Sequence, residues 1–279
     1  MQPMDRFLEI LDKASTPHDG AFRFGFGDFR VARQFFTTYL PPSVSRHLDL
    51  LCLEPVNKSF VDEQFNQRHS DMIYKTRLKG ETAFLYLLFE HQSSPDQMMI
   101  YRLFGYMNNF WKQYESRHAD VSTLPVVLPL VLYHGSQTWN APKRFCDILA
   151  GYTEDFAPFT PDFSYMLFDL NDYGKDVFHQ STDALLHLVL MQFRHIFDDD
   201  MNALIEMMSG LLNQIEPSDS FDKFGRWVFT YIYSARSEST ETLIEHASRA
   251  IHKTQNKKLW RIAMTAAEQW RQKMRDEGR

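Results

Sequence analysis

The 279 residues of this chain are 44% hydrophobic and 24% charged, which is enough apolar sequence to bury one large core or two smaller ones. This composition excludes a disordered or low-complexity chain, and two cysteines are too few for a disulfide framework. The first 15 residues carry acids and lack the apolar run of a signal peptide, and no stretch approaches the roughly 18 apolar residues of a membrane span. We therefore expect a soluble, cytoplasmic protein with no membrane partner.

The N-terminal part of the sequence is predicted to hold short helices and one strand. Residues 4–14 have the pattern of an amphipathic helix, and residues 18–20 indicate a turn. Residues 29–40 are predicted to form the next helix, and the apolar residues 48–55 a strand. A capping-box pattern opens a further short helix over residues 59–69.

The central part is predicted to contain a hairpin and two further strands. Residues 71–78 alternate in the manner of a strand, and a turn follows at 79–82. Residues 83–92 are almost continuously apolar and end in polar residues, which is typical of a strand buried on both faces that emerges at a functional edge. A long amphipathic helix over 96–117 and strands over 126–135 and 164–172 complete this part.

The pattern then becomes entirely helical, with helices predicted over 181–197, 200–215, 219–235, 239–252 and 257–276. The sequence therefore predicts an α/β domain over residues 1–177, built on a mixed sheet flanked by helices. An all-helical region with a basic tail is predicted to follow over residues 178–279.

The net charge of −6 does not suggest a nucleic-acid-binding protein, but the charge is unevenly distributed. Residues 1–222 contain 18 basic and 30 acidic residues, whereas residues 223–279 contain 12 and 6 and carry a net charge of +6. A basic segment on an acidic body is typical of a tail that contacts phosphate, although a solvated helix with surplus charge would look similar. The candidate DNA-binding residues of this tail are Lys253, Lys257, Lys258 and Arg261.

Acidic and amide side chains gather where the two strands of the predicted hairpin meet. Asp71 opens the first strand, and Glu90 and Gln92 lie on one face near the end of the second, because side chains alternate along a strand. An antiparallel hairpin brings these strand ends together. Two carboxylates and an amide oxygen are hard ligands that suit Mg²⁺, with Mn²⁺ and Ca²⁺ as alternatives. Glu63, eight residues before Asp71, could help to hold a second ion or could simply be a solvated residue near a helix start.

Three segments resemble one known family closely. They are SFVDEQFNQRHSDMIYK, YLLFEHQSSPDQMMIYRLFGYM and LPVVLPLVLYHG, and weaker likeness extends over nearly the whole chain. The family is that of the Rpn recombination-promoting nucleases, also labelled transposases, within the PD-(D/E)XK nuclease superfamily. The resemblance implies a PD-(D/E)XK-like sheet and cleavage of double-stranded DNA that depends on a divalent cation. It also implies that Asp71, Glu90 and Gln92 occupy the motif positions.

Most members of the superfamily carry lysine where this chain and the family it resembles have Gln92. A neutral glutamine cannot stabilise a nucleophile by charge, although it could hold a water or a ligand by hydrogen bonds. Lys75 is a candidate substitute, because it lies four residues after Asp71 and on the same strand face. The alternative is an edge lysine that discourages aggregation.

Arg102 and Tyr106 lie one helical turn apart on the helix that follows Glu90. The family resemblance suggests that their shared face borders the cleft, where Arg102 could contact phosphate. Alternatively, Arg102 pairs with an acid at the end of the sheet.

The sequence is thus interpreted as a metal-dependent DNA endonuclease involved in recombination, with a homodimer as a plausible way to cut both strands. A non-catalytic DNA-binding or partner-binding protein on a nuclease scaffold is the alternative, because the fold does not guarantee activity. A DNA-joining transposase is a third hypothesis, although no residue pattern here indicates strand transfer.

Overall fold

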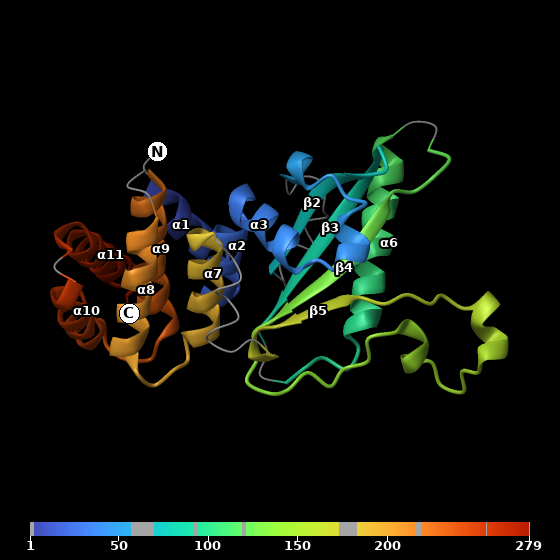
Figure 1. Cartoon of the computed structure of the whole chain (residues 1–279). Helices are drawn as coiled ribbons and strands as arrows, with labels where there is room; N and C mark the ends of the chain where they lie inside the picture. The colour runs from blue at the N-terminus through green and yellow to red at the C-terminus, as the bar shows by residue number, and fades with distance from the viewer. Residues whose placement is uncertain are drawn as a thin grey trace. The chain divides into compact units, whose positions relative to one another are not determined.

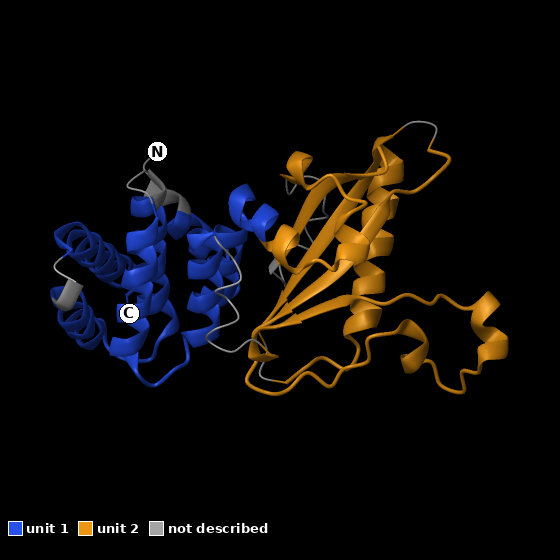
Figure 2. Cartoon of the chain, in the orientation of Figure 1, with its two compact units in different colours: residues 1–34, 174–279 blue, residues 35–173 orange. Residues whose placement is uncertain are grey.

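The computed structural model describes residues 3–56, 70–91, 94–118, 121–172, 183–215, 219–254 and 256–278. The chain forms two compact units, which are coloured separately in Figure 2. One unit, here called the sheet unit, comprises residues 35–173, and the other, the helical unit, comprises residues 1–34 and 174–279.

The sheet unit is built on five strands in the order β1-β2-β3-β4-β5 (Figure 1). Pairs β1–β2 and β2–β3 are antiparallel, whereas β3–β4 and β4–β5 are parallel, so the predicted mixed sheet is confirmed. The strands are β1 (Glu54–Pro55), β2 (Ser70–Leu78), β3 (Glu81–Glu90), β4 (Val126–Tyr133) and β5 (Met166–Asp169). Among its described residues, this unit also contains α4 (Pro42–Ser45), α6 (Met99–Arg117), η1 (Leu50–Cys52), η3 (Phe145–Ile148), η4 (Glu154–Phe159) and η5 (Leu170–Asp172).

The predicted hairpin is present, and its turn consists of Lys79 and Gly80. Both residues have positive φ, at 52° and 90°, as a two-residue turn between twisted antiparallel strands requires. The pairing of β2 with β3 runs without interruption from Leu78 opposite Glu81 to Ser70 opposite Phe89. The turn therefore determines which residues of the two strands meet at the far end of the hairpin.

Helix α6 covers one face of the sheet (Figure 1). Its apolar positions recur at helical spacing and pack on side chains of alternate strand residues. The buried residues of this interface are Ile73, Phe84, Tyr86, Leu88, Val127 and Val131 from the sheet and Met99, Ile100, Leu103, Met107 and Phe110 from α6. Helix α6 thus faces the same side of β3 as Glu90, which follows Tyr86 and Leu88 in the alternation.

The strand predicted over residues 48–55 is mostly absent. Residues 50–52 form the 3₁₀ turn η1 instead, and pairing with β2 is limited to Glu54, Pro55 and an isolated bridge from Leu48 to Leu78. The Asp49 carboxylate accepts a hydrogen bond from the Leu51 backbone N–H and so caps this turn. Apolar composition alone could not reveal this local capping.

The helical unit contains the C-terminal helices that the sequence predicted, so the all-helical C-terminal region is confirmed. Its helices are α1 (Pro3–Asp12), α2 (Pro17–Phe26), α7 (Ala184–His195), α8 (Met201–Gln214), α9 (Asp219–Ala235), α10 (Thr240–Thr254) and α11 (Lys257–Asp276). Helix α3 (Phe29–Tyr39) begins in this unit and ends in the sheet unit. The turn predicted at residues 18–20 is wrong, because Thr16 caps helix α2 there through the backbone N–H of Asp19, with Pro17 in the first helical turn.

The N-terminal helices belong with the C-terminal ones. The Phe24 ring of α2 lies 5.8 Å from Phe224 and 6.1 Å from Trp227, both on α9. The Nδ1 atom of His18 lies 2.6 Å from the Tyr231 hydroxyl, again between α2 and α9. Residues 1–34 therefore join the helical unit, whereas the sequence assigned residues 1–177 to a single domain.

None of the helices in the described part of the chain combines the length and the apolar character needed to cross a membrane.

Candidate active site

Asp71 and Glu90 lie on the same face of the sheet and near the same end of the hairpin. Asp71 is paired with Leu88 across the β2–β3 ladder, and Glu90 is two residues further along β3. Diagonal neighbours of this kind are about 7–8 Å apart in an antiparallel pair. Both side chains face the α6 side of the sheet, since Leu88 belongs to that core.

Glu90 is 3% exposed, and an arginine from α6 compensates its charge. The Arg102 Nη1 atom donates to Glu90 Oε2 at 3.2 Å and to Asp96 Oδ2 at 2.7 Å. Burial alone would lower the pKa of Arg102, but the hydrogen bond to Asp96 and the neighbouring Tyr106 and Glu90 outweigh burial and raise the pKa. Arg102 is therefore a permanent cation at this end of the sheet.

Two tyrosines complete the polar group. The Tyr86 hydroxyl donates a short hydrogen bond to Asp71 Oδ2. Burial raises the pKa of Tyr86 well above its usual value, and the Asp71 charge raises it further, so the phenol stays protonated and able to donate. The Tyr106 ring stacks on Tyr86 at 5.8 Å, and its pKa is raised by burial, an effect that Arg102 opposes.

Asp71, Tyr86, Glu90, Asp96, Arg102 and Tyr106 together are called the sheet-end cluster below. Of the predicted site residues, the structure brings together Asp71, Glu90, Arg102 and Tyr106. Glu63 and Gln92 lie outside the described residues. The sequence interpretation missed Asp96 and Tyr86. Two signals could have found them: Tyr86 shares the strand alternation of Glu90, and Asp96 precedes a long helix in the position of a capping acid.

The donor atoms of the sheet-end cluster suit a hard divalent cation, because the three carboxylates offer only oxygen ligands. Within the described ranges, no group of three or more His, Cys, Asp or Glu side chains is arranged to hold a metal ion. Two of the four predicted donors are outside those ranges. The Glu90 carboxylate lies in a buried position that already requires a positive neighbour, which is compatible with a cation site.

Lys75 lies on the α6 face of β2, as the alternation predicts, and beside the short edge strand β1. It is paired with Glu54 of β1 in the strand register, and its Nζ atom lies 3.5 Å from Glu54 Oε1. Half of the Lys75 side chain is exposed, and four residues along a strand separate it from Asp71 by about 13 Å. This position is that of a surface lysine paired with an acid of the neighbouring edge strand.

The basic residues of the tail lie on the last two helices. Lys257, Lys258 and Arg261 are exposed in the first turns of α11. The Lys258 Nζ atom is 3.1 Å from Asp222 Oδ1. The side chain of Lys253, in the last turn of α10, lies outside the described part of the structure.

The arrangement defines an α/β protein with a mixed sheet and a carboxylate cluster where β2 begins and β3 ends. The chain belongs to the family described as "Putative transposase, YhgA-like", whose model matches residues 16–222.

Among curated proteins, the chain is similar to three Escherichia coli relatives. It is 27% identical to recombination-promoting nuclease RpnC (strain K12) over 72% of this chain and 65% of that protein. It is 29% identical to recombination-promoting nuclease RpnD (O157:H7) over 71% of this chain and 75% of that protein. It is 27% identical to the inactive recombination-promoting nuclease-like protein RpnE (strain K12) over 74% of this chain and 67% of that protein.

The chain is therefore a distant homologue of the Rpn nucleases, which confirms the family predicted from the sequence. The similarity to RpnC spans slightly less than two thirds of that protein's length. No solved structure matches the chain significantly. Because the family includes both nucleases and proteins named inactive, membership alone does not establish catalysis.

Proposed function

We propose that this protein is a divalent-metal-dependent endonuclease that hydrolyses phosphodiester bonds of double-stranded DNA. The observation that carries the proposal is the position of Asp71 and Glu90, on one face and at one end of the hairpin, in a chain homologous to nucleases. Carboxylates so close together repel one another unless a cation lies between or beside them. Arg102 offsets the charge of Glu90, and a metal ion would offset that of Asp71.

The proposed metal ligands are Asp71, Glu90, Gln92 and Glu63, with Mg²⁺ as the preferred ion. When bound, a divalent cation polarises a phosphate oxygen and lowers the pKa of a water in its coordination sphere. The chain's own residues orient the carboxylates. The Tyr86 hydroxyl fixes one oxygen of Asp71, and Arg102 restrains Glu90 from α6.

Arg102 and Tyr106 are proposed to face the DNA backbone beside the carboxylates. The Arg102 side chain is 19% exposed and bonds both Glu90 and Asp96, so a phosphate would share its guanidinium with these acids. The basic tail supplies a second contact through Lys253, Lys257, Lys258 and Arg261. Double-strand cutting needs two active sites or two visits, and a homodimer is the simpler proposal.

The decisive experiment incubates purified protein with supercoiled plasmid and Mg²⁺, Mn²⁺, Ca²⁺ or EDTA, with nicked and linear products quantified separately. We expect the wild-type protein to cut with Mg²⁺ or Mn²⁺, and the Glu90→Gln variant to be inactive. Asp162→Asn is the matched control, because Asp162 pairs with Arg144 outside the sheet-end cluster. Equal cutting by wild type and Glu90→Gln at equal folding would reject the proposal.

One observation favours the non-catalytic alternative, in which the chain only binds DNA or a partner. Arg102 already supplies the positive charge that Glu90 requires, so the sheet-end cluster does not depend on a metal for charge balance. The two hypotheses differ in Mg²⁺-linked stabilisation. A nuclease site should raise the Tm at millimolar Mg²⁺, whereas a binding protein need not.

A further inference from the structure

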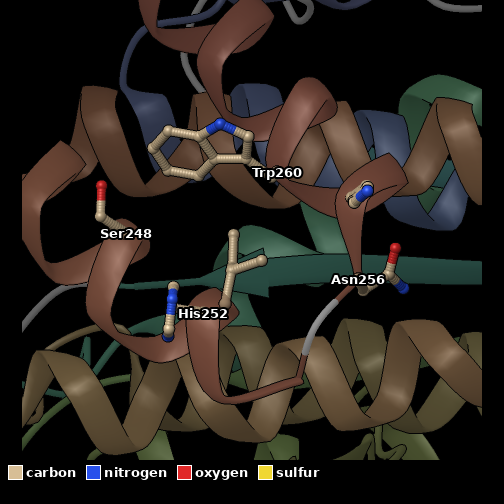
Figure 3. Close-up of a pocket in the computed structure, with 6 residues that line it drawn as sticks. Ser248, His252, Asn256 and Trp260 are labelled. Carbon is tan, nitrogen blue, oxygen red and sulfur yellow. The ribbon is translucent and has the colours of Figure 1, made fainter.

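A groove opens at the junction of helices α10 and α11, within the helical unit. It has a volume of about 520 Å³ and is lined by Ser248, Ile251 and His252 of α10 and by Asn256, Lys257 and Trp260 beside and within α11. Figure 3 shows Ser248, His252, Asn256 and Trp260 around this hollow. The volume lies within the ~300–1,000 Å³ typical of small-ligand pockets.

An exposed indole forms one wall of the groove. Trp260 is 37% exposed, whereas its neighbours Leu259 and Ile262 on α11 are 0% and 5% exposed. Lys257 lies three residues before Trp260 and so shares its side of α11, whereas Arg261 lies one turn after Lys257, at the border of that side. An aromatic face flanked by cations is thus presented to solvent rather than to the core.

The segment that forms the groove carries a surplus of cations, although Arg249 pairs with Glu245 and Lys258 with Asp222. Residues 249–261 contain three lysines and two arginines and no acidic residue, in a chain whose first 222 residues are strongly acidic. Lys257 and Arg261 are exposed, and His252 is exposed on the facing helix. An anionic ligand with a flat apolar part therefore complements the groove in both charge and shape.

We propose that this groove binds an unpaired base of single-stranded DNA, with the base stacked on Trp260 and its flanking phosphates near Lys257 and Arg261. The inference deepens the proposed DNA-directed function and rests on it for the choice of DNA. Bases within a duplex are stacked on each other and cannot offer a face to an indole. Single strands can, and stacking platforms beside cationic grooves are how proteins bind them.

The test measures binding of a fluorescein-labelled oligo(dT) of about 15 nucleotides to the full chain in EDTA, by fluorescence anisotropy. Trp260→Ala should weaken binding roughly 5- to 150-fold, the range expected for loss of one base–aromatic stack. Trp260→Phe keeps a ring and should retain most of the affinity. Trp270→Ala, which removes an indole of the same helix that lines another hollow, is the matched control and should bind as wild type.

A second probe separates the base from the backbone. An abasic oligonucleotide of the same length carries the phosphates alone, so wild type and Trp260→Ala should bind it equally. The proposal is overturned if Trp260→Ala binds oligo(dT) as tightly as wild type, at an unchanged Tm. It is also overturned if oligo(U) binds more tightly than oligo(dT), because the ligand would then be RNA.

Plasmid cleavage distinguishes this inference from the proposed function. If the wild-type protein cuts DNA but Trp260→Ala retains oligo(dT) affinity, only the groove assignment fails. If the protein never cuts DNA but loses oligo(dT) affinity on Trp260→Ala substitution, the nuclease proposal fails and the groove assignment stands.

Discussion

Asp71 and Glu90 face the same side of the sheet, but their surroundings differ. Glu90 is buried against a permanent cation, whereas Asp71 is half-buried and takes its hydrogen bond from a neutral phenol. A carboxylate that faces a neutral donor keeps its negative charge available for a metal ion. Asp71 is therefore the residue whose charge the proposed chemistry needs most.

Asp71→Asn should abolish metal-dependent cleavage and leave the fold intact, because the asparagine carbonyl still accepts the Tyr86 hydrogen bond. Asp71→Ala should also be inactive but should lose about 1–3 kcal/mol of unfolding free energy, the cost of an unsatisfied buried hydroxyl. Urea unfolding beside plasmid cleavage checks both. An active Asp71→Asn variant would remove Asp71 from the proposed site.

Arg102→Leu should destabilise the protein by about 3–5 kcal/mol in EDTA, because it leaves the buried Glu90 carboxylate without its cation. Millimolar Mg²⁺ should restore part of this loss if the cluster binds metal. The control is Arg144→Leu, which breaks an exposed pair with Asp162 and should change the Tm little with or without Mg²⁺. The measurement is thermal unfolding of the three proteins in EDTA and in Mg²⁺, and a Mg²⁺-independent Tm for Arg102→Leu would argue against a metal site.

At the scale of elements, the hairpin is what aligns Asp71 with the end of β3. Its register follows from a two-residue turn with positive φ at both positions. A slip of one residue would turn either Asp71 or Glu90 to the opposite face. The Lys79-Gly80 turn thus keeps Asp71 and Glu90 on the same face of the sheet.

Gly80→Ala should lower the unfolding free energy by about 1–2 kcal/mol, the penalty for placing a Cβ in left-handed backbone. A Cβ added at Gly80 would meet no neighbouring atom within 4 Å, so the cost is conformational and not steric. Gly105→Ala is a matched control in α6, where space is also free; it should stabilise by about 0.5–1 kcal/mol. Urea unfolding gives the change in unfolding free energy for each variant. Changes of opposite sign would support this account, and changes of the same sign would contradict it.

Lys75→Met should leave the cleavage rate near that of wild type, because Lys75 pairs with Glu54 on the edge strand and lies well away from Asp71. If Lys75 instead replaced the motif lysine, the rate would fall by about 10²-fold or more. Single-turnover cleavage with excess enzyme separates the two cases without interference from binding.

At the scale of the whole molecule, residues 1–222 carry a net negative charge and residues 223–279 a net positive charge, which suggests that the two segments have different roles toward DNA. The carboxylates that would hold a metal belong to the sheet unit, whereas the exposed cations of α11 belong to the helical unit. Affinity for the DNA backbone and chemistry at the phosphate would then be separable by mutation.

Replacing Lys253, Lys257, Lys258 and Arg261 with Gln should weaken duplex DNA binding and flatten its salt dependence. Each lost phosphate contact should reduce the slope of log K against log salt by about 0.9. Lys258 is expected to contribute least, since Asp222 already pairs with it. Titrations of a labelled duplex at several salt concentrations provide the slopes, and an unchanged slope would exclude the tail as the DNA contact. Cleavage of bound DNA under single-turnover conditions should change little.

The sequence by itself predicted the elements whose signals are local. The hairpin followed from alternation and a Lys-Gly turn, and α9 and α11 begin and end at the predicted residues because helical periodicity extends over their whole length. The same alternation brought Asp71 and Glu90 to one face. Local signals failed at residues 18–20 and 48–55, where single capping side chains outweighed composition.

Only the tertiary structure decided which distant residues meet. The sequence alone leaves open whether Arg102 faces solvent, phosphate or an acid. The packing of α6 on the sheet directs its side chain to Glu90 and Asp96. Residues 1–34 join the helical unit through contacts such as Phe24 with Phe224, which are 200 residues apart. Periodicity specifies which face of an element is apolar, but not which other apolar face covers it. That choice depends on burying the largest area over the whole chain.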